Sequence, residues 1–111
     1  MPSATTVLTA TISSGQTNSD EQDIVDAKYV GLIMPATWTE ADITFQVTNV
    51  SGGTWRDLLT DEGIPIRLKV RAAQAYAIDR YAYGLAPWRF LRIVSSVAQG
   101  AQRLILIVIK A

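Results

Sequence analysis

The sequence predicts an all-β protein: an antiparallel, jelly-roll-like β-sandwich of about eight short strands. Two segments, 42–48 and 64–70, alternate apolar and polar side chains, which is the pattern of strands with one buried and one exposed face. Hydrophobic residues make up 49% of the chain and charged residues 18%, and Val, Ile, Thr and the aromatic residues outweigh Glu, Lys and Met. Most connections are too short for crossover helices, so the strands must pair antiparallel.

The first half of the chain contains four predicted strands. The first covers Thr6–Ile12, which is rich in β-branched residues and places Leu8, Ala10 and Ile12 on one face. The small and polar residues at 13–22 predict an exposed loop. The next strands are expected at 24–25, at 28–34, where Pro35 ends the strand because it has no N–H to donate, and at 43–47.

The second half of the chain supplies the remaining strands. A tight glycine turn at 51–53 precedes a short strand at 55–58, and a turn at 60–63 leads into a strand at 64–70. That strand is expected to turn one face inward, consisting of Ile64, Ile66, Leu68 and Val70. Pro65, on its other face, indicates a sheet edge or a strand end. The last strands are expected at 75–78, 88–94 and 103–110.

The last predicted strand is apolar on both faces, because Leu104, Leu106 and Val108 alternate with Ile105, Ile107 and Ile109. Burying such a side chain is worth about 1.5 to 3 kcal/mol, so neither face is expected to remain in water. One interpretation is a central strand covered by loops or by the N-terminal segment of the same chain. The alternative is a contact between subunits.

Residues 1–111 are expected to form a single domain with a short N-terminal arm at about residues 1–6. The first residues contain neither a basic nor a long apolar stretch, and the longest apolar run, Leu104–Ile109, is far shorter than the roughly 18 residues of a membrane span. We therefore expect a soluble protein made in the cytoplasm, without a membrane partner. Ten basic and ten acidic side chains give a net charge of zero, which argues against nucleic acid as the main ligand.

The chain contains no His and no Cys, so it lacks the commonest general base, the commonest zinc ligand and any thiolate nucleophile. The acidic residues at 20–26 lack the ligand spacing and central glycine of a calcium loop. The carboxylates that remain for acid–base chemistry are of the residue types common in turns and lie in or near expected turns: Asp57, Asp61, Glu62 and Asp79. We expect no enzyme activity, no catalytic residues, no cofactor and no metal site.

One loop and its flanks concentrate aromatic and guanidinium groups, which are frequent in protein interfaces because they combine a large apolar area with a polar tip. The members of this aromatic loop group are Tyr76, Arg80, Tyr81, Tyr83, Trp88 and Arg89. The same side chains could stack on sugar rings. In a third interpretation Tyr76 and Trp88 belong to the core and the others decorate a loop.

Residues 30–47, VGLIMPATWTEADITFQV, followed by 52–58, GGTWRDL, resemble small structural proteins encoded among tailed-bacteriophage head genes, the capsid decoration or cement proteins. The resemblance extends more loosely through 77–79 and 88–93, and so covers most of the chain from Thr11 onward. The matching residues are mainly fold-forming, with Met34-Pro35 ending a strand and Trp38 capping the edge of the sandwich.

This resemblance implies a protein that binds the outside of an assembled phage head and stabilises contacts between major capsid subunits, commonly as a homotrimer. It implies synthesis in the host bacterial cytoplasm and a place on the outer capsid surface of the virion. The aromatic loop group and the N-terminal arm, including Pro2 and Thr5, would make the contacts. The alternatives are a head–tail connector or tail component, and a carbohydrate-binding module on the virion surface.

Overall fold

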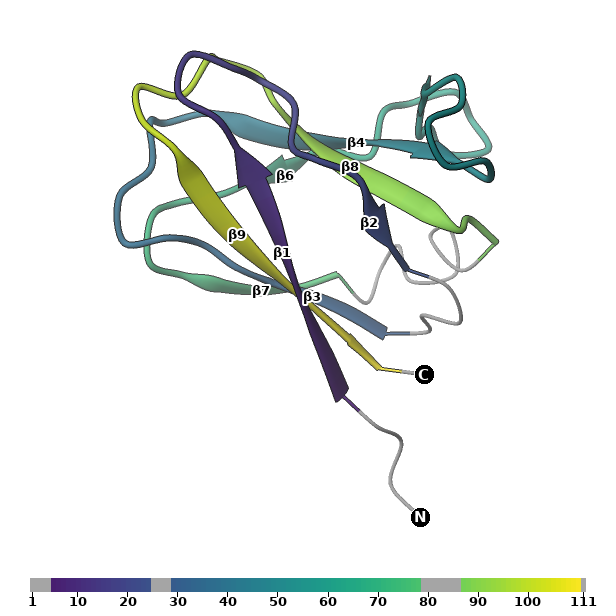
Figure 1. Ribbon diagram of the computed structural model, residues 1–111, viewed down its shortest axis with the longest axis horizontal. Helices are drawn as coiled ribbons and strands as arrows, with labels where there is room; N and C mark the ends of the chain where they lie inside the picture. Colours follow the sequence, from purple (N-terminus) through teal and green to yellow (C-terminus); the bar gives the residue numbers. More distant parts are fainter. Residues whose placement is uncertain (1–4, 25–28, 79–86, 111) are drawn as a thin grey trace.

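The structure of the chain is a computed structural model that describes residues 5–24, 29–78 and 87–110 (Figure 1). In these ranges the chain forms two β-sheets and no helix. Sheet A consists of β1 (Thr5–Ile12), β9 (Arg103–Lys110), β3 (Tyr29–Ile33) and β7 (Ala75–Ala77), in that order. Sheet B consists of β2 (Gln22–Asp23), β8 (Phe90–Ser95), β4 (Asp42–Thr48) and β5 (Arg56–Asp57), and β6 (Leu68–Lys69) also pairs with β4.

The strand order is that of a jelly roll. All strand pairs are antiparallel. Successive strands alternate between the two sheets, except in the run β4-β5-β6, so strands far apart in sequence become neighbours. The predicted all-β, jelly-roll-like sandwich is therefore confirmed. Among the described residues, no helix is long and apolar enough to cross a membrane.

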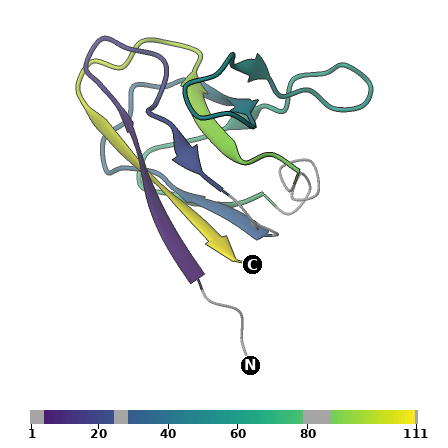
Figure 2. The same ribbon diagram turned by 45° about the vertical axis from the view of Figure 1, so that its right-hand side comes forward.

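The core lies between the two sheets, because alternate side chains of each strand point inward. In Figure 2 the paired strands β1 and β9, purple and yellow, lie on one side of the molecule and β8, green, on the other. β9 contributes Ile105, Ile107 and Ile109, so the isoleucine face is the one of its two apolar faces that meets the core. Sheet B contributes a matching set that includes Ile43, Phe45 and Ile93.

A fully buried glutamine joins the loops at one end of the sandwich. The backbone N–H of Gly15 donates to the carbonyl oxygen of Gln99 at 2.7 Å, and the N–H of Gln99 donates to the carbonyl of Gln16 at 3.1 Å. The side-chain Nε2 of Gln99 donates to the Ser95 hydroxyl at 2.9 Å. The backbone of Gln99 thus holds the β1–β2 and β8–β9 connections together, while its buried side-chain amide is satisfied by hydrogen bonds of its own.

The exposed loop predicted at 13–22 is shorter than expected. Ser19 is buried, and it exchanges hydrogen bonds of 2.8 Å with the backbone of Ile93. β2 then pairs with Leu91 and Phe90 of β8. The prediction was wrong at Ser19 and Gln22, because hydrogen bonds to a distant strand, which local composition does not reveal, hold these residues against β8. Asp20 and Glu21 between them are exposed, as predicted.

The strand predicted at 64–70 forms only at Leu68–Lys69. Thr60 and Ile64 close a tight turn, in which the Thr60 N–H donates to the Ile64 carbonyl at 2.7 Å and Gly63 has a φ of +78°. Ile64 is 57% exposed, so the prediction that it faces the core was wrong. The turn and the missing N–H of Pro65 explain the loss of the strand's first half.

The strand expected at 24–25 is displaced: β2 is Gln22–Asp23, Ile24 follows it outside the strand, and Val25 lies outside the described residues. The remaining strand predictions agree with the structure to within a few residues, and β9 has the predicted bounds. The glycine turn at 51–53 is confirmed: Gly52 has a φ of +69°, and the Gly53 N–H donates to the Val50 carbonyl at 2.8 Å. β1 already begins at Thr5, which pairs with Lys110, so the last two residues assigned to the N-terminal arm belong to the sheet.

Candidate docking surface

The side chains of sheet A that point away from the core form a nearly uncharged surface. Two rows cross the four strands in the order β1, β9, β3, β7. One row is Val7, Val108, Gly31 and Ala77, and the next is Thr9, Leu106, Ile33 and Ala75. We call the apolar members of these rows, together with Leu104, the outer apolar face.

Several members of the outer apolar face are open to solvent. Val7 is 55% exposed, Leu104 49% and Ile33 42%. β9 lies between β1 and β3, so its central position agrees with one of the two interpretations of this strand. The described residues leave the outward side of Leu104 half open, and apolar side chains gathered in this way are typical of an interaction surface.

Small residues create a shallow groove in the outer apolar face. The groove has a volume of about 510 Å³, and its floor and walls include Gly31, Ala75, Ala77 and Val108. Gly31 is the smallest of these residues. A Cβ atom at this position would lie 3.3 Å from the carbonyl oxygen of Tyr76, which is closer than most side chains permit. Thr5 and Lys110 supply the polar rim at one end.

The outward face of sheet B is chemically different, because polar side chains cross its strands. The Gln46 amide nitrogen donates to an Asp57 carboxylate oxygen at 2.9 Å, and Arg92 Nε donates to the Gln46 amide oxygen at 2.7 Å. The Arg92 guanidinium also lies 4.7 Å from the ring centre of Trp55. Such satisfied groups suit exposure to water, so the two outer faces of the sandwich are not equivalent.

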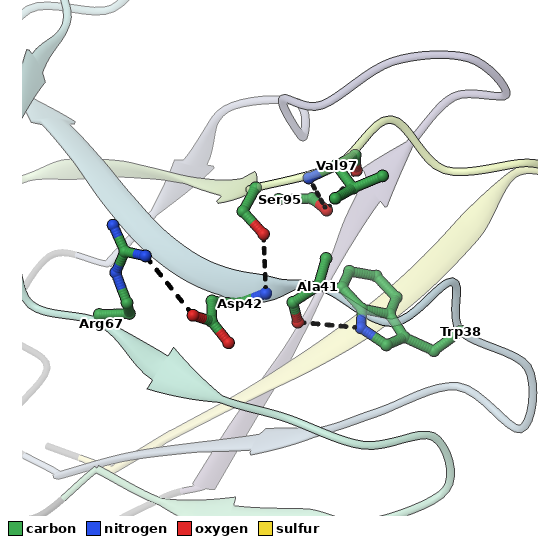
Figure 3. Close-up of polar contacts among 7 residues, drawn as sticks. Trp38, Ala41, Asp42, Arg67, Ser95 and Val97 are labelled. Atoms are coloured by element: carbon green, nitrogen blue, oxygen red, sulfur yellow. Dashed lines mark hydrogen bonds and ion pairs between the residues drawn. The ribbon is translucent and has the colours of Figure 1, made fainter.

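Trp38 lies at an end of the sandwich, in the connection between β3 and β4. Its side chain is half-buried against the core, and its Nε1–H donates to the Ala41 carbonyl at 3.4 Å (Figure 3). Next to it Asp42 forms a 3.5 Å ion pair with Arg67. This placement agrees with the predicted capping role of Trp38.

Three members of the aromatic loop group lie in the described residues. Tyr76 points inward from β7 and packs against the core, and its hydroxyl accepts a 2.8 Å hydrogen bond from the Arg71 N–H. Trp88 is also half-buried against the core. Arg89 is exposed, 3.6 Å from the Asp23 carboxylate and 5.1 Å from the ring centre of Phe90.

The structure describes one of the remaining candidate residues, which are Arg80, Tyr81, Tyr83, Pro2 and Thr5. Arg80, Tyr81, Tyr83 and Pro2 lie outside the described residues, so their role in an interface stays a prediction. Thr5 is exposed on β1, at the rim of the groove. Among the described residues, Tyr76 and Trp88 therefore act as core-packing side chains, and Thr5 is the one that borders the outer apolar face.

The candidate carboxylates lie on the surface. Asp57, Asp61 and Glu62 are exposed, and Asp79 lies outside the described residues. In the part of the chain that the structure describes, no three acidic side chains come close enough to hold a metal ion.

Most of the outer apolar face could not be identified from the sequence. The double alternation of β9 pointed to a second apolar surface, but Val7, Ile33 and the alanines of β7 join it only through the pairing of distant strands. Each of these residues alone is an ordinary strand residue. The strand order was the missing information.

No family model and no curated protein matches the sequence. Among solved structures, the chain is similar to the SPBc2 prophage-derived protein YomS, at 10% identity and a TM-score of 0.58, with 100% of this chain and 98% of that chain covered. A weaker likeness links it to Peruvianin-I, a cysteine peptidase from Thevetia peruviana latex, at 10% identity and a TM-score of 0.47, over 96% and 50% of the two chains. At this identity the likeness to YomS shows a common fold and nothing more.

Proposed function

We propose that the chain is a structural protein of a tailed-bacteriophage virion, a cement protein that binds the outside of the assembled head and stabilises contacts between major capsid subunits. The observation that supports this most is the outer apolar face. Exposed apolar side chains on a rigid sheet provide a surface that another protein can cover, and a cement protein needs such a surface but no reactive groups. We propose no catalytic step and no cofactor.

The difference between the two sheets suggests which face of the protein would contact the capsid. Sheet A would lie against the capsid, because covering Val7, Ile33 and Leu104 removes apolar surface from water. Sheet B would face outward, since its Asp57, Gln46 and Arg92 side chains already bond to one another. A copy bound across neighbouring capsid subunits recognises only the assembled lattice and stabilises it by mass action.

The fold likeness to YomS fits this proposal, because that protein is prophage-derived and the similarity spans both chains. The sequence resemblance to decoration proteins adds the capsid as partner and the outer virion surface as location. The trimer that the resemblance implies stays a prediction. A connector or tail component would use the same fold and differ in position on the particle.

The experiment compares virions of the encoding phage with particles that lack this gene. We expect the particles without the protein to lose their DNA at a lower temperature, and purified protein added to them to restore heat resistance. Equal heat resistance with and without the protein, in particles shown to have bound it, would overturn the proposed function. Binding restricted to the neck or tail would support the connector alternative instead.

A further inference from the structure

The strand edges of the two sheets differ sharply in length. β7, at one edge of sheet A, has three residues, and β2, β5 and β6 of sheet B have two each. β1, at the other edge of sheet A, has eight residues, TTVLTATI, and pairs with β9 over its whole length without a bulge. It contains no charged residue and no Pro, which are among the features that normally prevent an edge strand from pairing with another chain.

Only the end of this edge is occupied within the described residues. The Thr11 N–H donates to the Asp20 carboxylate at 2.8 Å, and the Thr11 carbonyl accepts from the Asp20 N–H at 3.1 Å. Thr11 therefore directs its backbone groups away from β9. Because alternate residues of an antiparallel strand bond to the same side, Thr5, Val7 and Thr9 direct their N–H and C=O groups the same way.

We infer that this edge pairs with the β1 edge of a second copy of the chain, antiparallel and around a twofold axis next to Val7. In this register Val7 lies opposite Val7 of the other copy, and Thr5 lies opposite Thr9. The backbone groups of these three residues that point away from β9 then bond to one another. The two A sheets become one continuous sheet, with β7 at each end.

The chemistry of the strand favours a second copy as the occupant. A twofold axis brings identical strands together, which would place like charges near each other if β1 were charged, but it is neutral. The exposed Val7 side chains would cover each other. A ring of copies would instead need β1 to pair with β7, and eight residues cannot be matched by three.

Such a dimer also enlarges the outer apolar face. A twofold axis perpendicular to a sheet keeps the same face of both copies on the same side. The rows that contain Val7 and Thr9 would therefore continue from one copy into the next. For the isolated protein the inferred dimer is an alternative to the trimer that the sequence resemblance implies. The proposed function requires neither assembly, so the inference can fail or hold independently of it.

The test is the mass of the purified chain, measured by native mass spectrometry and by light scattering over a concentration series. We expect twice the mass of one 12.1 kDa chain at high concentration, with dissociation on dilution. Val7→Pro removes an N–H that points away from β9, so it should abolish the dimer while the β-sheet circular dichroism spectrum is kept. Val7→Thr keeps the N–H and should remain a dimer.

A charge exchange tests the register, and it remains informative if Val7→Pro fails to fold. Thr5→Lys with Thr9→Lys places like charges opposite each other and should raise the dimer dissociation constant on the order of ten-fold. Thr5→Lys with Thr9→Glu places opposite charges together and should restore it. A wild-type chain that is monomeric at every concentration, a trimer, or equal behaviour of the two double variants would overturn the inference.

Discussion

The side-chain amide of Gln99 pairs with the backbone of Thr39 in both directions, as a neighbouring strand would. The Thr39 N–H donates to Gln99 Oε1 at 2.9 Å, and Gln99 Nε2 donates to the Thr39 carbonyl at 3.1 Å. Arg103 Nε donates to the same Oε1 at 3.2 Å. One buried side chain thus fastens the β3–β4 connection to the β8–β9 connection and to the start of β9.

Gln99→Ala should therefore destabilise the sandwich more than most substitutions in a loop do. The substitution leaves partly buried backbone groups of Thr39 without these partners and opens a cavity where the fully buried side chain was, and we expect a loss of about 3 kcal/mol in the free energy of unfolding. Denaturant unfolding followed by circular dichroism measures it. Gln102→Ala, at an exposed loop position, is the control and should change stability by less than about 0.5 kcal/mol. Equal losses would show that the Gln99 contacts are unimportant.

Two substitutions in β9 separate the core face from the outer apolar face. Ile107 is 1% exposed, so Ile107→Ala should cost about 2 to 5 kcal/mol of stability through the cavity it leaves. Leu104→Ala should cost about 1 kcal/mol or less, because that side chain is half in water already. Thermal melting of both variants checks the expectation. A Leu104 variant as unstable as the Ile107 variant would mean that the outer face is covered.

Ala77→Asp tests whether the groove contacts the capsid. Ala77 is exposed beside Gly31, so a carboxylate there should leave the melting temperature nearly unchanged. An interface would have to desolvate that charge, and we expect capsid binding in co-sedimentation to weaken more than ten-fold. Thr54→Asp, an exposed position near β5, is the control and should bind normally. If both variants bind alike, the groove lies outside the contact.

Arg92→Ala tests the polar network of sheet B. Arg92 contributes a hydrogen bond to Gln46 and a ring contact with Trp55, each worth about 1 kcal/mol in a partly exposed setting. We expect a lower melting temperature but undiminished capsid binding, since this face is proposed to point away from the shell. Arg56→Ala on β5, on the far side of β4, where the side chain is exposed, should leave both quantities near wild type. Loss of binding by Arg92→Ala at retained stability would reverse the proposed orientation.

The sequence predicted the fold well where each strand carries its own pattern. In β1, Leu8, Ala10 and Ile12 alternate with threonines, and β9 is a short run of β-branched and other apolar residues, so the local sequence suffices to place both strands. It failed where distant contacts decide the backbone, as at Ser19, whose hydroxyl bonds to a residue 74 positions away. It failed also at Ile64, where a turn and a proline overrode an alternating pattern.

The candidate site was less predictable than the fold. Aromatic composition drew attention to Tyr76 and Trp88, but the structure packs both against the core. The outer apolar face depends on Val7, Val108 and Gly31 lying in one row, although they come from three separate parts of the chain. Local sequence patterns contain no information on which strands become neighbours.

A cryo-electron microscopy reconstruction of the virion, compared with particles lacking this chain, tests the central claim most directly. We predict difference density on the outside of the head, over contacts between major capsid subunits, with β1, β9, β3 and β7 toward the shell and the Arg92 side outward. Density confined to the neck or tail, or heads bound through the Arg92 side, would contradict the account.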